Sequence, residues 1–193
     1  MNVQSPTSDQ IRDFVIAGHG NLGQVKSMLT ELPELLDVAY AWSEADRETA
    51  VMAAAHMGNR PIAEFLLEQG APLAICTAAM LGEQGAVQDW LARDPILIHA
   101  HGAHTIPLLA HAALSGKVDL MELLVTSGAI EGDSFALSNA VSFGHQPLAR
   151  WLLENTQADL AWKNWEEKTA LTLAVTRGDE DMEKLLRQHT ARE

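Results

Sequence analysis

Apolar positions recur at helical spacing around six glycines of the chain. A pair of small or apolar residues ends three positions before each glycine, and a mostly apolar pair lies eight and nine positions after it. Apolar positions three and four residues apart share one face of a helix, and the spacing does not alternate as in a strand. The six copies are Ile16-Ala17-x-x-Gly20 with Met28-Leu29, Ala54-Ala55-x-x-Gly58 with Leu66-Leu67, Ala78-Ala79-x-x-Gly82 with Trp90-Leu91, Ala112-Ala113-x-x-Gly116 with Leu124-Val125, Ala140-Val141-x-x-Gly144 with Leu152-Leu153, and Ala174-Val175-x-x-Gly178 with Leu186-Arg187.

Each copy predicts a short helix, a tight turn at the glycine and a second, antiparallel helix. Glycine adopts a positive φ without steric cost, which suits the end of the first helix. One such hairpin cannot bury its own apolar face, so the copies should stack in a row. We therefore predict an all-α solenoid of about six helix-turn-helix units, forming one domain over residues 8–189 with short tails at 1–7 and 190–193. The expected units are residues 8–41, 46–72, 73–100, 104–130, 132–157 and 166–189.

The second copy resembles the ankyrin repeat, whose family pattern is T-P-L-H-x-A-A-x-x-G-H-x-x-I-V-x-x-L-L-x-x-G-A. The sixth copy is similar, and the resemblance covers roughly residues 8 to 189. It implies a stack whose first helices line a concave groove, with β-hairpin fingers above them. The matching positions of the second copy are Thr49 through Ala55, Gly58, Ile62-Ala63, Leu66-Leu67 and Gly70-Ala71.

Two connections are too short for the family's finger. Pro72-Leu73 leads almost directly from the second unit into the next first helix, and little chain separates Gly128 from Phe135. Fingers are therefore expected only near residues 38–48, 96–106 and 158–168. A third unit without a finger resembles those of many bacterial ankyrin proteins, which suggests a bacterial source.

The groove is the expected binding surface. The resemblance implies that the two residues before each turn glycine point into it, and in the middle units many of these residues are apolar. An exposed apolar row marks a binding site more often than a free surface, and methionine adapts its shape to a partner. The alternative is that neighbouring side chains cover the row. The expected partner-binding residues are His56, Met57, Met80, Leu81, Leu114, Phe143 and Arg177 in the groove, and Trp42, His101, His104 and Trp165 on the fingers.

Composition limits the classes of partner and the cellular compartment that are expected. The formal net charge is −13 and no Lys/Arg cluster is present, so nucleic acid and anionic membranes are not expected partners. This negative charge either keeps the protein soluble or favours the binding of a basic, partly apolar protein surface. A single cysteine, Cys76, excludes an intrachain disulfide, and the N-terminus lacks the pattern of a secretory signal. Both features favour the cytoplasm.

Candidate chemistry is sparse. His99, His101 and His104 lie within six residues and could coordinate zinc, although no fourth ligand is evident nearby. The simpler interpretation is an exposed finger. Cys76 precedes the Ala78-Ala79 pair and is expected to be a buried, inert thiol. No nucleophile elbow, phosphate-binding loop or metalloprotease motif occurs. We therefore expect a non-catalytic protein-binding module without a cofactor, with a metal-dependent sensory or catalytic protein built on the histidine finger as the alternative.

Overall fold

The computed structural model describes residues 5–190, and its described part contains six antiparallel helix pairs. Short 3₁₀ turns, η1 (Pro33–Leu35), η2 (Pro95–His99) and η3 (Ala103–Thr105), interrupt the connections. The all-α solenoid predicted from the sequence is confirmed. Residues 1–4 and 191–193 of the expected tails lie outside the described residues. The pairs are α1 (Ser8–Gly18) with α2 (Leu22–Glu31), α3 (Ala50–His56) with α4 (Arg60–Glu68), α5 (Ile75–Leu81) with α6 (Gln84–Arg93), α7 (Leu108–Ala113) with α8 (Val118–Thr126), α9 (Asp133–Ser142) with α10 (Gln146–Asn155), and α11 (Ala170–Arg177) with α12 (Glu180–Thr190).

Local signals in the sequence set the helix ends. The Thr49 hydroxyl accepts a hydrogen bond from the backbone N–H of Met52 and so caps α3, and Thr169 caps α11 in the same way. The turn glycines from Gly58 to Gly178 have φ between 65° and 73°, as expected where an L side chain would be strained. Gly20 is the exception, because the first turn closes without a positive φ.

Fingers form at the three expected places. Strands β1 (Tyr40–Ala41) and β2 (Arg47–Glu48) pair antiparallel, with Tyr40 opposite Glu48. Single β-bridges join His101 to Pro107 and Lys163 to Thr169. The two short connections lead directly into α5 and α9. Each finger is thus a minimal hairpin that presents its tip beside the first helices.

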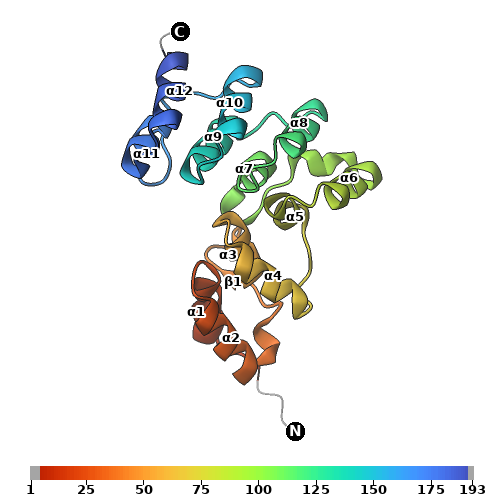
Figure 1. Ribbon diagram of the computed structural model, residues 1–193. Coiled ribbons are helices and arrows are strands. Elements are labelled where there is room, and N and C mark those ends of the chain that lie inside the picture. The colour runs from red at the N-terminus through yellow and green to blue at the C-terminus, as the bar shows by residue number, and fades with distance from the viewer. Residues whose placement is uncertain (1–4, 191–193) are drawn as a thin grey trace.

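The first helices α1, α3, α5, α7, α9 and α11 pack in sequence, and the second helices lie outside them (Figure 1). Helices α5 to α12 form an arc, and α1 to α4 lie below it in this view. The buried side chains fall into two clusters. One centres on Phe14, Ile62 and Leu66 of the first two units, and the other runs from Ile75 to Leu186 through the remaining units. The boundary between them lies near the connection from α4 to α5, one of the two connections without a finger.

The second unit closes over the ends of α5 and α7 at this boundary. Met80, Leu81 and Leu114 belong to the buried cluster of the first two units, and the Arg60 guanidinium donates a hydrogen bond to the Leu81 carbonyl (2.7 Å). The Phe143 ring reaches as far as Gly58, where an added Cβ would lie 2.6 Å from its Cζ. The missing finger does not leave the apolar row open here, because the short connection brings the second unit onto the row.

Candidate functional site

A groove of about 540 Å³ lies between the second unit and the C-terminal units. Its wall is mostly apolar, with a few polar groups from the fingers and from α9, as in many binding sites. It therefore combines elements far apart in the sequence. The lining residues are His56, Met57, His104, Ile106, Leu114, Phe135, Asn139, Ser142, Phe143, Asn164, Trp165, Glu166 and Leu173.

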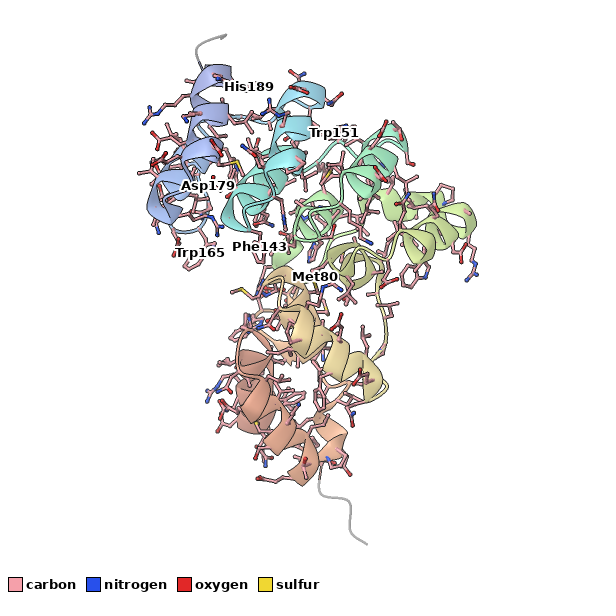
Figure 2. All side chains as sticks on the ribbon, viewed as in Figure 1. Met80, Phe143, Trp151, Trp165, Asp179 and His189 are labelled. Carbon is pink, nitrogen blue, oxygen red and sulfur yellow. The ribbon has the colours of Figure 1, made fainter. Side chains whose placement is uncertain are left out.

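Three large apolar side chains of this groove are open to solvent. Met57 is 44% exposed, Phe143 42% and Trp165 82%. Figure 2 shows Phe143 and Trp165 on the side of the C-terminal units that faces the second unit. Contact between apolar groups of this size and water is unfavourable in free energy, and a bound partner that covers them would remove this cost. They are the strongest candidates for contact with a partner.

The predicted groove row is only partly exposed. Met80 is 2% exposed and Leu81 6%, so neither can contact a partner. The prediction that Met80 and Leu81 contact a partner was therefore wrong, because both are core residues at the boundary between units two and three. Leu114 is also buried, although it contributes to the groove wall. The two residues before a turn glycine do not line the groove where a neighbouring unit covers the end of the first helix.

The remaining predicted contact residues are scattered. Arg177 donates to the Ser142 carbonyl and lies against Gly144, outside the groove lining. His101 is exposed and its Nε2 lies 3.1 Å from a Glu131 oxygen. Trp42 is exposed, but it lies outside the groove lining, and its ring packs edge-on against Tyr40. His56, predicted in the groove, lines it, and so do His104 and Trp165, which were predicted on the fingers.

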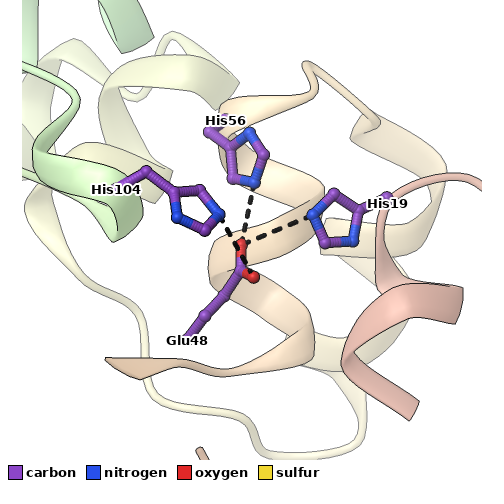
Figure 3. A group of neighbouring side chains, drawn as sticks. All are labelled: His19, Glu48, His56 and His104. Atoms are coloured by element: carbon purple, nitrogen blue, oxygen red, sulfur yellow. Dashed lines mark hydrogen bonds and ion pairs between the residues drawn. The ribbon is translucent and has the colours of Figure 1, made fainter. Parts of the chain in front are cut away.

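His19, Glu48, His56 and His104 form a compact cluster beside the groove (Figure 3). They come from the end of α1, strand β2, the end of α3 and turn η3. The Glu48 carboxylate is fully buried and accepts hydrogen bonds from Trp42 Nε1 (2.7 Å) and His56 Nε2 (2.8 Å). Nε2 of His19 lies 3.7 Å and Nε2 of His104 3.5 Å from its oxygens.

Two carboxylates of the first finger stay ionised. Burial alone would raise the pKa of Glu48, but hydrogen bonds from His56 and Trp42 outweigh it, so its pKa lies below the ordinary value. Asp46 accepts hydrogen bonds from the backbone N–H and the Nδ1–H of His104, at 3.0 and 2.6 Å. The backbone hydrogen bond is the main reason that the pKa of Asp46 is lowered. The cluster therefore has a permanent negative charge facing three imidazoles.

The histidine trio proposed from the sequence does not come together. Only His104 of the set joins the cluster, while His99 and His101 are exposed and point elsewhere. The spacing within the finger was the wrong criterion, because the ligand atoms that converge lie on four separate elements. Cys76 is buried as expected, and burial raises the pKa of its thiol to about 12, which makes it unreactive.

Sequence reasoning missed Glu48 and did not connect His19 with His56. One partial signal was available: His19 lies one residue and His56 two residues before the turn glycines of neighbouring units, so both lie at the ends of neighbouring first helices. Glu48 directly precedes the capping threonine of the same unit. The resemblance of neighbouring repeats could have placed these three together. The approach of His104 depends on the bend of the stack and had no local signal.

The stacked helix pairs, aligned turns and short fingers define a helical repeat protein of the ankyrin type. Sequence models of this family agree: "Ankyrin repeats (3 copies)" matches residues 109–192, and "Ankyrin repeat" matches residues 46–78. The chain is also similar to I-Kappa-B like protein F1 of Microplitis demolitor bracovirus (isolate Webb), with 30% identity over 131 residues, or 63% of this chain and 80% of that protein. The chain belongs to the ankyrin repeat family. The relative is viral, so the bacterial source suggested above has no support from it.

Proposed function

We propose that the chain is a non-catalytic interaction module that holds a protein partner in its groove. Ankyrin repeats are generally protein–protein interaction modules, and this chain has a groove suited to that role. The observation that carries the proposal is the exposure of Met57, Phe143 and Trp165 around one hollow. Aromatic residues are enriched among the residues that dominate binding energy at interfaces.

The partner proposed is a segment that is partly apolar and basic. The apolar part would cover the exposed wall of the groove, and the basic part would face Glu166 in the groove lining, within a chain of net charge −13. Complementary charge speeds association and selects against acidic competitors. Nucleic acid and anionic membranes are disfavoured on the same ground. Among residues 5–190, no helix is both long and apolar enough to cross a bilayer.

The cytoplasm remains the expected compartment, because the chain has a single cysteine and that thiol is buried. We expect no enzyme activity and no organic cofactor. The carboxylates and imidazoles that lie together are paired with one another, and the one thiol is inert. A partner that binds in the groove would therefore be held without being changed.

Paired substitutions test the proposal. Met57→Asp/Phe143→Asp should abolish capture of the partner from extracts of the source organism, since two charges would then face its apolar surface. The matched control is Ile96→Asp/Ile130→Asp, which alters two exposed isoleucines away from the groove lining. The captured protein is identified by mass spectrometry, and its Kd is measured for all three chains.

Circular dichroism must give the same helical signal and Tm for both double variants. The groove pair should weaken binding by at least about 100-fold, the loss of two interface anchors of about 1.4 kcal/mol or more each. The isoleucine pair should bind like the unaltered chain. Equal loss in both variants, or retention in the groove pair, would refute the assignment of the groove.

A further inference from the structure

The protonation of two histidines in the cluster is fixed by their neighbours. Nδ1 of His19 lies 3.0 Å from the Val15 carbonyl oxygen, and Nδ1 of His104 lies 2.6 Å from the Asp46 carboxylate. Both partners are acceptors, so in each ring Nδ1 carries the proton. In the neutral rings Nε2 is then a bare lone pair, and both lone pairs face the carboxylate of Glu48.

Lone pairs that face a carboxylate repel it unless a positive charge lies between them. Protons on both rings could supply that charge, one on each ring. A metal cation would satisfy all the acceptors at once. The direction of each Nδ1–H, toward a backbone carbonyl or a carboxylate, is the arrangement that commonly orients histidine ligands of zinc.

The distances suit a small ion with four ligands. All four side chains offer a ligand atom, and these atoms lie within 4.8 Å of one another. In a tetrahedral zinc site with bonds of about 2.0–2.1 Å, neighbouring ligand atoms are about 3.3–3.4 Å apart. The separations of 3.5 and 3.7 Å between Glu48 and the outer two histidines are close to that spacing. His56 is nearer, at 2.8 Å, because its Nε2–H donates to Glu48 directly, so a bound ion would replace this proton.

We propose that His19, Glu48, His56 and His104 bind a divalent first-row metal ion, with Zn²⁺ as the best match. Three imidazoles and one carboxylate are ligands of the borderline class that zinc takes, whereas Mg²⁺ and Ca²⁺ prefer oxygen alone. The single charge of Glu48 and the nearby Asp46 balance the ion. This site is distinct from the His99, His101 and His104 set suggested by the sequence, with which it shares one residue.

The proposed metal site is structural and not catalytic. Four protein ligands complete a tetrahedral ion, and no position is left for water or substrate. Three of the ligands belong to the first two units, and His104 belongs to the finger between the third and fourth units. A metal bond would therefore tie the two core clusters together across the connection that lacks a finger. Since His56 and His104 also line the groove, the ion would fix the shape of one groove wall.

The backbone at His104 supports this role. His104 and the β-branched Thr105 have φ of 57° and 56°, a conformation that L residues rarely adopt. Asp46 holds this turn through the backbone N–H and the ring of His104. Strain of this kind persists only where the surroundings impose it, and here the result is that Nε2 of His104 faces Glu48.

Zinc titration of the full chain, with any affinity tag removed and the metal stripped by a chelator, tests the proposal. Calorimetry should give one equivalent of Zn²⁺, and Zn²⁺ should raise the Tm. His19→Ala and His104→Ala should each weaken zinc binding by more than the about 10- to 100-fold that loss of a supporting hydrogen bond costs. Both side chains are partly exposed, so these variants should fold. His99→Ala is the matched control and should bind like the unaltered chain.

Co²⁺ provides a second readout, because a four-coordinate cobalt site absorbs visible light much more strongly than hydrated cobalt. The unaltered chain and His99→Ala should show this band, and Glu48→Gln and His104→Ala should lose it. The proposal is overturned if less than about a tenth of an equivalent of zinc binds, far below the single site expected of four ligands. It is also overturned if His99→Ala loses zinc while His19→Ala retains it.

Discussion

His111, on α7, is a buried titratable residue that the sequence did not single out. Its Nδ1–H donates to the Pro107 carbonyl (3.1 Å), and the backbone of Gly102 packs against its ring, where an added Cβ would lie 2.6 Å from Cε1. Burial lowers the pKa of His111 to about 4, and positive charge on His56 or His101 would lower it further. It is therefore neutral in the folded chain above about pH 4.

The protonation of His111 predicts a pH dependence of stability. Its pKa is about 4 in the folded chain and about 6.5 in the unfolded chain, so between these values only the unfolded state binds the proton. The free energy of unfolding should therefore fall by up to about 3 kcal/mol as the pH falls from 6.5 to 4, at 1.36 kcal/mol per pKa unit. Urea denaturation across this range measures it.

His111→Gln isolates this contribution, because other groups also titrate as the pH falls. Glutamine keeps a donor for the Pro107 carbonyl but has no proton to gain. The variant should lose less stability than the unaltered chain between pH 6.5 and 4. Parallel pH curves for the two proteins would contradict the account of His111.

At the residue scale, the sequence predicted burial where burial is set by the repeat itself. Cys76 is buried because it lies on the packed face of a first helix, which its distance from the Ala78-Ala79 pair indicates. Met80 and Leu81 were predicted to be exposed and are not, because they are covered by a different unit. Their own repeat contains no signal for that contact.

Close approach between first helices depends on small residues. At Gly18 of α1 an added Cβ would lie 2.6 Å from the carbonyl oxygen and 2.9 Å from the Cα of Ala50 on α3. Both are backbone atoms, so a side chain here could only push the helices apart. Gly20, two residues on, has nothing within 4 Å of the added Cβ position.

Gly18→Ala should therefore lower the free energy of unfolding by about 1–3 kcal/mol, the usual cost of overpacking. Gly20→Ala is the control, and its effect should stay within about 0.5 kcal/mol, as for surface substitutions. Chemical denaturation of both variants makes the comparison. Equal stability of the two would mean that α1 and α3 are not in such close contact.

At the element scale the prediction from sequence went furthest. Helix pairs, turn glycines and the places of the three fingers all followed from local patterns, because capping, positive φ and connection length are properties of short segments. The first turn, at Gly20, is the exception, since it closes with ordinary backbone angles. The motif correctly predicted the position of this turn, but the glycine does not adopt the expected positive φ.

The bend of the whole molecule could not be read from the repeats. It brings Phe143 of the fifth unit against Gly58 of the second, and His104 of a later finger against Glu48 of the first. Contacts between units far apart in the stack depend on small rotations summed over several interfaces. The sequence predicted which helices exist, whereas the groove and the histidine cluster depend on how the second unit meets the third.

The groove is the central claim, and covalent capture at one position tests it most directly. A benzophenone amino acid is placed at Phe143, in the groove, or at Ile130, which is exposed outside it. Each protein is irradiated in cells of the source organism, and the adducts are identified by mass spectrometry. The account predicts one dominant protein adduct from position 143 that is missing from position 130. No adduct at 143, or the same adducts at both positions, would contradict it.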